Sequence, residues 1–173
     1  MPAYAGMTNY EFNMSETIKN ISQLLIAKNW QLVTAESCTG GLVAKYLTDQ
    51  AGSSQWFERG LITYSNAAKQ ELLGVSLRSL EKYGAVSEEV ACEMALGALK
   101  HSRAQVSLAI TGIAGPDGGS LDKPVGTVWF AFATKESEVI SKMQHFPGDR
   151  QSIREQAALF ALQGLLSLLH KLN

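Results

Sequence analysis

The segment TAESCTGG, residues 34 to 41, places two nucleophilic side chains and two glycines between two apolar runs. The run before it, residues 31 to 35, is short and rich in Leu, Val and Thr, which is typical of a buried strand. Apolar residues at helical spacing follow it and predict a helix from about residue 39 to 49. Ser37 and Cys38 are therefore expected on a strand-to-helix turn, where free backbone N–H groups and the helix dipole favour an anion.

Either Ser37 or Cys38 is a candidate nucleophile. A thiol at a helix start has a depressed pKa and reacts readily, whereas a serine hydroxyl needs a neighbouring base. The residue types alone do not separate these two possibilities. A third interpretation is structural: Ser37 or Thr39 caps the helix, and the glycines only relax the turn.

Lys69 is the candidate base for a serine nucleophile, because none of the three histidines lies in a motif-like setting: His101, His145 and His170. With Asn66 as the predicted cap, Lys69 falls in the first turn of a helix, where the dipole and partial burial lower an amine pKa. Tyr64 precedes that helix and is a candidate to relay a proton or to orient the amine. The alternative is a solvated Lys69 and a structural Tyr64.

The segment FPGDR offers a different chemistry, because Arg150 enters the first turn of the closing helix. A guanidinium and free backbone N–H groups together can bind a phosphate, and Arg154 lies one turn further on. The glycine- and proline-rich segment 111 to 126 is too long for an idle turn and is a second candidate binding loop. The alternative for FPGDR is that Asp149 caps the helix while Arg150 pairs on the surface.

Strands interleaved with helices must position these residues. The predicted helices include one capped by Ser15 and one capped by Ser87, and the predicted strands cover residues 31–35, 59–65, 105–110, 127–134 and 138–146. This alternation predicts an α/β fold of three layers around a mostly parallel sheet, with the last two strands paired antiparallel. Sites in such sheets form beyond the carboxyl ends of strands, and the three unusual loops leave such ends at 37, 64–66 and 111–117.

The 173-residue chain has the composition of one soluble globular domain, with 46% hydrophobic and 18% charged residues. Its net charge of −1 predicts neither a nucleic-acid partner nor a membrane surface, and the absence of a signal or spanning segment favours a cytoplasmic location. Its cysteines and histidines have no metal-ligand spacing, so we expect no metal. Residues 1–14 are interpreted as a loose extension, with Met7 and Met14 as alternative starts, and residues 15–173 as the domain.

Several motifs together resemble the CinA C-terminal-domain family: AESCTGG, GSSQWFERGLITYSNAAK, LLGV, YGAVSEEV, TGIAGPDGGSLDKPVGTVWFAF and FPGDR. The resemblance covers roughly residues 15 to 170 and implies a three-layer α/β/α domain with a five-stranded mixed sheet, acting as a homodimer. The implied activity is deamidation of nicotinamide mononucleotide to nicotinate mononucleotide and ammonia in pyridine nucleotide salvage, without metal or other cofactor. Some members carry an amino-terminal nucleotide-pyrophosphatase-like domain, which we expect to be absent here.

The resemblance also implies roles for individual residues. The family's serine, lysine and tyrosine map onto Ser37 as nucleophile, Lys69 as base and Tyr64 as its helper. The implied oxyanion and substrate-binding positions are Cys38, Thr39, Gly40, Thr111, Gly112, Gly115 and Arg150. Whether Arg150 or the glycine-rich loop holds the phosphate stays open. Three rivals also remain: a thiol amidase, a non-catalytic nucleotide-binding module, and an assembly or regulatory protein that keeps only the fold.

Overall fold

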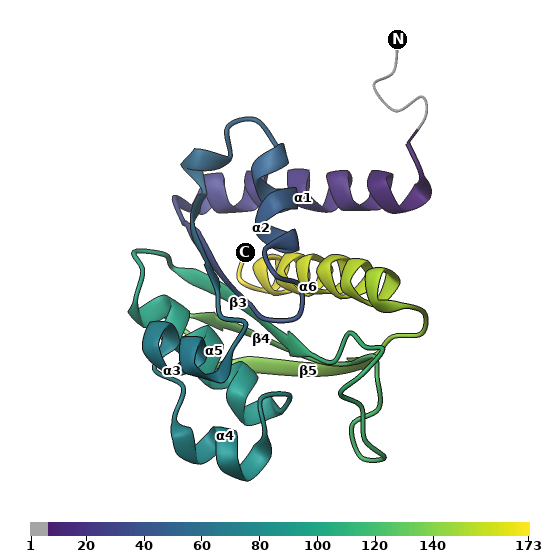
Figure 1. Cartoon of the computed structure of the whole chain (residues 1–173). Helices are drawn as coiled ribbons and strands as arrows, with labels where there is room; N and C mark the ends of the chain where they lie inside the picture. Colours follow the sequence, from purple (N-terminus) through teal and green to yellow (C-terminus); the bar gives the residue numbers. More distant parts are fainter. Residues whose placement is uncertain (1–6) are drawn as a thin grey trace.

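A five-stranded mixed sheet forms the middle layer of the computed structural model, which describes residues 7–173 (Figure 1). The strands lie in the order β2-β1-β3-β4-β5. β1 pairs in parallel with β2 and β3, whereas β4 pairs antiparallel with β3 and β5, so only β4 opposes the common direction. The strand bounds are Leu32–Glu36 for β1, Phe57–Ile62 for β2, Val106–Gly112 for β3, Thr127–Thr134 for β4 and Ile140–His145 for β5. This arrangement confirms the predicted α/β fold.

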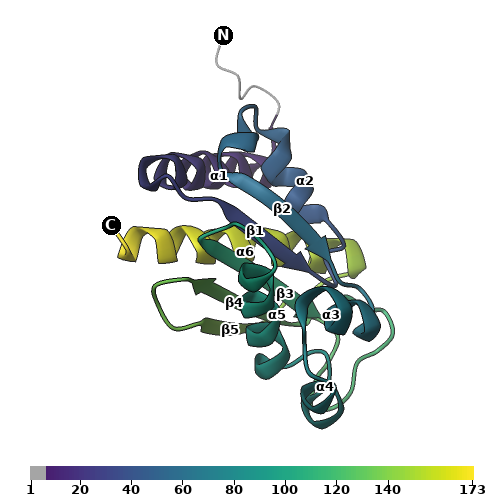
Figure 2. The ribbon, with the colours of Figure 1, turned by 90° about the vertical axis from the view of Figure 1, so that its left-hand side faces the viewer.

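Helices cover both faces of the sheet (Figures 1 and 2). One face packs against α1 (Asn9–Lys28), α2 (Leu42–Asp49) and α6 (Arg150–Lys171), and the other against α3 (Asn66–Leu73), α4 (Leu77–Tyr83) and α5 (Glu88–Lys100). A 3₁₀ turn, η1 (Ser53–Gln55), joins α2 to β2. Within the described part of the chain, no helix combines the length and apolar character needed to cross a membrane.

The first helix begins earlier than predicted. Thr8, and not Ser15, is its cap: the Thr8 hydroxyl accepts the backbone N–H of Glu11, and the Glu11 carboxylate accepts the N–H of Thr8 in return. The buried face of α1 also extends back to Met14, so these residues gain packing by being helical. Residues 9–14 of the expected loose extension therefore belong to α1, and residues 1–6 lie outside the described residues.

The sheet register brings the three unusual loops together. Glu36, the last residue of β1, stands opposite Ile62 of β2 and Ile110 of β3. Two hydrogen bonds carry this alignment past the strand end: Thr63 N donates to Glu36 O at 2.8 Å, and Ser37 N donates to Ile110 O at 3.0 Å. The loops leaving three parallel strands therefore begin side by side at one edge of the sheet, as predicted.

A glycine sets the distance between two helices on the opposite side of the sheet from α6. A Cβ atom built on Gly97 of α5 would lie 1.9 Å from the carbonyl oxygen of Leu73, at the end of α3. Because α3 also carries Lys69, the close approach of α5 helps to fix that helix against the sheet.

We expect Gly97→Ala to lower the free energy of unfolding by about 1–3 kcal/mol, because the added methyl group must push α5 away from α3. Urea denaturation followed by circular dichroism measures this loss. Leu96→Ala is the matched control, since Leu96 is exposed on the same helix and its truncation is expected to change stability by only about 0.5 kcal/mol. Equal stability of Gly97→Ala and the wild type would contradict the packing argument.

Candidate active site

Ser37 and Lys69, predicted from separate loops, meet in the structure. Lys69 Nζ lies 2.9 Å from Ser37 Oγ, and it donates to the carbonyl oxygens of Thr63 at 2.8 Å and Tyr64 at 3.4 Å. Ser37 is 7% exposed and Lys69 is 1% exposed. A lysine amine is thus held against a serine hydroxyl at the carboxyl end of the sheet, almost out of contact with solvent.

The start of α3 places this lysine. Ser65, and not Asn66 as predicted, is the cap, because its hydroxyl accepts the backbone N–H of Ala68 at 3.0 Å. Lys69 is consequently the fourth residue of the helix, and its own N–H already donates to the Ser65 carbonyl oxygen. Burial lowers the pKa of Lys69 below its ordinary 10.5, and no carboxylate among residues 7–173 forms an ion pair with it. Desolvation is therefore the main cause of the lowered pKa.

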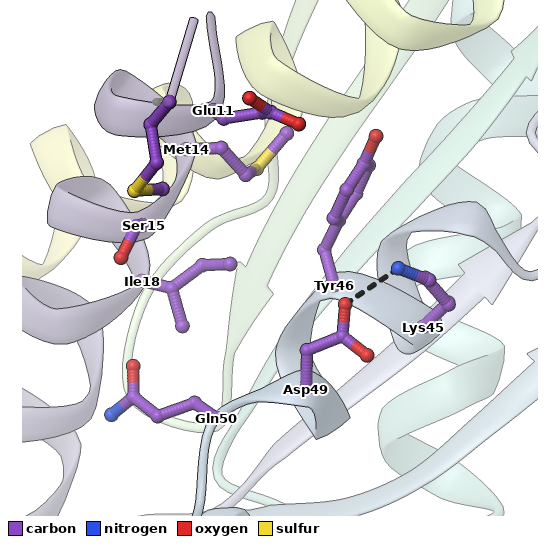
Figure 3. Close-up of a pocket in the computed structure, with 9 residues that line it drawn as sticks. Glu11, Met14, Ser15, Ile18, Lys45, Tyr46, Asp49 and Gln50 are labelled. Atoms are coloured by element: carbon purple, nitrogen blue, oxygen red, sulfur yellow. Dashed lines mark hydrogen bonds and ion pairs between the residues drawn. The ribbon is translucent and has the colours of Figure 1, made fainter. Parts of the chain in front are cut away.

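A second lysine shows why burial matters. A cavity of about 500 Å³ between α1 and α2 is larger than the one at Ser37, and it also contains a serine, Ser15, and a lysine, Lys45 (Figure 3). Lys45 is exposed there, and its ion pair with Asp49 at 2.6 Å raises the pKa of Lys45. A lysine that holds its proton this firmly is a poor general base, so size alone does not identify the active site.

The cavity at Ser37 has a volume of about 260 Å³ and lies beyond the carboxyl ends of β1, β2 and β3. The predicted positions that line it are Ser37, Cys38, Tyr64, Lys69, Thr111, Gly112, Gly115 and Arg150. Thr39 and Gly40 do not line it. Sequence reasoning missed its apolar wall of Ala85 and Val86, which a hydrogen bond from Thr111 Oγ1 to Ala85 O at 2.8 Å connects to β3. The motif YGAVSEEV was the only signal for that wall.

Arg150 brings an unpaired positive charge to this cavity. Asp149 caps α6, as the alternative interpretation of FPGDR expected, but Arg150 forms none of the surface ion pairs that it also expected. Its Nη1 donates to Gly115 O at 2.8 Å and its Nη2 to the Tyr64 hydroxyl at 3.0 Å, and it forms no ion pair with a carboxylate of residues 7–173. An uncompensated guanidinium at a cavity is suited to bind an anionic group.

Tyr64 occupies a different place from the one predicted for a proton relay. Its side chain is 58% exposed and its hydroxyl accepts a hydrogen bond from Arg150. Only its backbone carbonyl oxygen contacts Lys69. The structure therefore groups the Tyr64 side chain with Arg150 and not with the amine.

Cys38 lacks the properties expected of a reactive thiol. Its side chain packs in the core beneath α2 and α6, and burial raises the pKa of the thiol to about 12. The expected depression of this pKa is wrong, because burial disfavours the charged thiolate and the carboxylate of Glu36 raises the pKa further. The helix begins only at Leu42, and the buried carboxylate of Glu36 accepts the N–H groups of Val43 at 2.9 Å and Ala44 at 3.0 Å.

Arg154 also has a task other than the predicted one. Its Nε donates to Cys38 O at 3.0 Å and its Nη2 to Thr39 O at 2.9 Å, so it contacts the turn after β1 from the side of α6. No local sequence pattern predicts this contact or the contact of Glu36 with α2, because the fold decides which residues lie near each other.

Within residues 7–173, no three or more His, Cys, Asp or Glu side chains gather as a potential metal-binding group.

Comparisons with known proteins match most of this chain to one family. Residues 14–169 match the CinA C-terminal domain family. The chain is 58% identical to the nicotinamide-nucleotide amidohydrolase PncC of Enterobacter agglomerans over 90% of this chain and 95% of that protein. It is 55% identical to the PncC of Escherichia coli K12 over 92% and 95%. The crystal structure of the competence/damage inducible protein CihA from Agrobacterium tumefaciens superposes with a TM-score of 0.87 at 43% identity, covering 90% of this chain and 95% of that one.

The buried lysine predicts a specific pH dependence of stability. Between the lowered pKa of Lys69 in the folded chain and about 10.5 in the unfolded chain, unfolding takes up a proton, so the free energy of unfolding rises with pH. We expect this rise, at most about 1.4 kcal/mol per pH unit, to disappear in Lys69→Met when both proteins are unfolded in urea between pH 7 and 10.

Lys45→Met is the matched control for this measurement. The pKa of Lys45 is raised, so its contribution has the opposite sign and is lost as the pH rises through that pKa. Parallel pH profiles for the wild type and Lys69→Met would show that the Lys69 amine is not desolvated in solution.

Proposed function

This chain belongs to the CinA C-terminal domain family, and from that premise we propose that it hydrolyses the carboxamide of nicotinamide mononucleotide to nicotinate mononucleotide and ammonia. Such an activity would serve pyridine nucleotide salvage. The names of the PncC relatives support the substrate. The observation that carries the chemistry is the 2.9 Å contact between Lys69 Nζ and Ser37 Oγ in a buried setting.

In the proposed mechanism a neutral Lys69 is the general base. A neutral amine has two hydrogens and one lone pair. The carbonyl oxygens of Thr63 and Tyr64 accept the two hydrogens, so the lone pair is directed at the third neighbour, the Ser37 hydroxyl. As Ser37 Oγ bonds to the carboxamide carbon, its proton passes to Lys69 Nζ.

The rest of the cycle uses the same two groups. Lys69 returns the proton to the leaving nitrogen, the C–N bond breaks, and ammonia departs from an acyl-enzyme on Ser37. A water molecule then gives a proton to Lys69 and adds to the acyl carbon, and the Ser37 oxygen leaves with that proton as the acid is released. No step requires Tyr64, whose side chain we assign to the substrate together with Arg150.

A backbone N–H group of the turn after β1 is proposed to hold the oxyanion. Gly40 N donates to Ser37 O at 3.0 Å and the Ser37 N–H donates to β3, so neither is free for this purpose. The Cys38 N–H donates to no backbone or side-chain oxygen of residues 7–173, and Cys38 lines the cavity, so we assign the oxyanion to this N–H. The Thr39 N–H has no oxygen acceptor there either, but Thr39 is buried and does not line the cavity. The predicted role of Gly40 as a donor is replaced by a role in shaping the turn.

The phosphate is assigned to Arg150. Its charge has no carboxylate partner among residues 7–173, and both of its neutral acceptors, Tyr64 and Gly115, line the same cavity. The apolar wall of Ala85, Val86 and neighbouring residues is suited to the flat face of the pyridinium ring. The cavity therefore offers one end for the phosphate and another for the nicotinamide ring and its carboxamide.

A thiol amidase and a non-catalytic binding module are the rivals to exclude. Purified protein, incubated with nicotinamide mononucleotide and a chelator, is expected to release ammonia and nicotinate mononucleotide in equal amounts. We expect Ser37→Ala to reduce turnover by at least about a thousandfold, because the nucleophile is lost. Cys38→Ala should change it by less than about tenfold, because the thiol stays protonated and buried. Loss of activity only in Cys38→Ala would favour the thiol, and tight binding without ammonia would favour the binding module.

Arg150→Met tests the phosphate assignment. We expect KM for nicotinamide mononucleotide to rise by about tenfold or more, because a charge-assisted contact is lost, while kcat changes less. The preference for the mononucleotide over nicotinamide riboside, which lacks the phosphate, should fall by the same factor. Arg59→Met, which removes an exposed arginine paired with Glu58, should leave both constants unchanged. An unaltered preference in Arg150→Met would place the phosphate elsewhere.

A further inference from the structure

Arg154, a residue far along the chain, forms hydrogen bonds with the turn that carries Ser37. Arg154, on α6, donates from Nε to Cys38 O and from Nη2 to Thr39 O at 3.0 and 2.9 Å. These are consecutive carbonyl groups, and one planar guanidinium contacts both. The contact adds to the apolar packing that holds α6 beside α2 (Figure 1).

Peptide planarity converts this contact into a direction for N–H groups. The carbonyl of Cys38 and the N–H of Thr39 belong to one trans peptide, so they point in opposite directions. Because Arg154 fixes the carbonyl of Cys38 toward α6, the N–H of Thr39 is turned away from α6. The next peptide is fixed in the same way, since Arg154 holds the carbonyl of Thr39 and the N–H of Gly40 donates to Ser37 O.

Gly40 lies beside the guanidinium in a left-handed backbone conformation. Its φ is +57°, in the left-handed region, and a Cβ atom there would lie 3.4 Å from Arg154 Nη2. The residue therefore combines a backbone conformation that favours glycine with a close approach to the arginine.

The charges around the turn give Arg154 a second task. The N-terminus of α2 offers no open positive end, because the Glu36 carboxylate accepts the N–H groups of Val43 and Ala44. Lys69 is neutral in the proposed mechanism. Arg154 has no ion-pair partner among the residues that the structure describes, and its positive charge lies against the carbonyl groups of the Cys38–Thr39 and Thr39–Gly40 peptides. The second of these peptides carries the Gly40 N–H, whose bond to Ser37 O fixes the Ser37–Cys38 peptide and with it the direction of the Cys38 N–H. A cation on the carbonyl side of a peptide strengthens the N–H on its other side as a donor.

We propose that Arg154 is a positioning residue of the hydrolysis, which aims and polarises the turn after β1, through its Thr39–Gly40 peptide, so that the Cys38 N–H stabilises the oxyanion formed on attack by Ser37. This inference rests on the proposed amidase function. It assigns to one turn of α6 two arginines with separate tasks: Arg150 contacts the substrate, and Arg154 acts only through the backbone of the turn.

Arg154→Met and Arg154→Lys test the proposal with nicotinamide mononucleotide as substrate. The methionine removes the charge and both donors, and we expect kcat to fall on the order of a hundredfold while KM changes by less than about threefold. The lysine keeps the charge but cannot contact both carbonyl groups with one planar group. Its kcat should therefore lie between those of Arg154→Met and the wild type. The pH at which kcat rises should stay unchanged, since the Ser37–Lys69 contact is intact.

A ligand pair separates positioning from general structural damage. The aldehyde analogue of the substrate adds to Ser37 Oγ and forms a tetrahedral oxyanion, whereas the product nicotinate mononucleotide binds without one. Arg154→Met should weaken the aldehyde by about the same factor as kcat and leave the product affinity within about threefold. Arg78→Met, which removes an exposed arginine on α4, is the control for both ligands. If Arg154→Met does not fold by circular dichroism, Arg154→Lys decides by the same two affinities.

Three results would overturn the inference. A kcat within twofold of the wild type in folded Arg154→Met would make the contact purely structural. A raised KM with unchanged kcat would place Arg154 on the substrate, and equal weakening of aldehyde and product would show general damage to the cavity. An active wild type in any of these cases leaves the proposed function standing, whereas a wild type that releases no ammonia overturns both.

Discussion

The burial of the Lys69 amine beside Ser37, without a carboxylate to neutralise it, is the constraint on which the rest of the site depends. A charged ammonium in this place would be costly, because the carbonyl oxygens that surround it replace only part of its hydration. The fold therefore favours the neutral amine, which is the form that can accept a proton. Lys45 shows the opposite case, since exposure and Asp49 keep its proton bound. Burial therefore lowers the pKa of one lysine, and the contact with Asp49 raises the pKa of the other.

This constraint also explains the construction of the turn after β1. A site that contains a neutral base and a developing oxyanion needs positive potential, and a free helix N-terminus is the usual source. Here Glu36 occupies the N–H groups at the start of α2, which fixes the helix to the strand but removes that source. The positive charge instead comes from α6, where Arg154 contacts the turn and Arg150 faces the cavity. Ser37 and the two arginines near it thus come from distant parts of the chain.

Local patterns were sufficient to predict the sheet, the turn at Ser37 and the three loops, because each depends on periodicity, on glycine or on strand-end topology. They failed at helix starts with two competing caps: Thr8 prevails over Ser15 through its pairing with Glu11, and Ser65 lies one residue before Asn66. Spacing could place Tyr64 near Lys69 but not direct its side chain, which the distant Arg150 fixes. The raised pKa of Cys38 could not be predicted from the sequence for the same reason, since it follows from core packing beneath α2.

The dependence of a turn at residues 37–40 on an arginine 116 positions away has a consequence for how the site forms. The sheet register aligns Ser37 with β3, and the amine of Lys69 on α3 bonds to Thr63 at the end of β2, so the proposed nucleophile and base can meet once those elements pack. The carbonyl groups of Cys38 and Thr39 gain their side-chain donor when α6 packs against α2, because no other side chain of residues 7–173 donates to them. Docking of the last helix therefore brings Arg150 to the cavity and Arg154 to the turn in one step, since the two arginines lie one turn apart on it. A site arranged in this way is completed by tertiary packing, and neither end of the chain contains it alone.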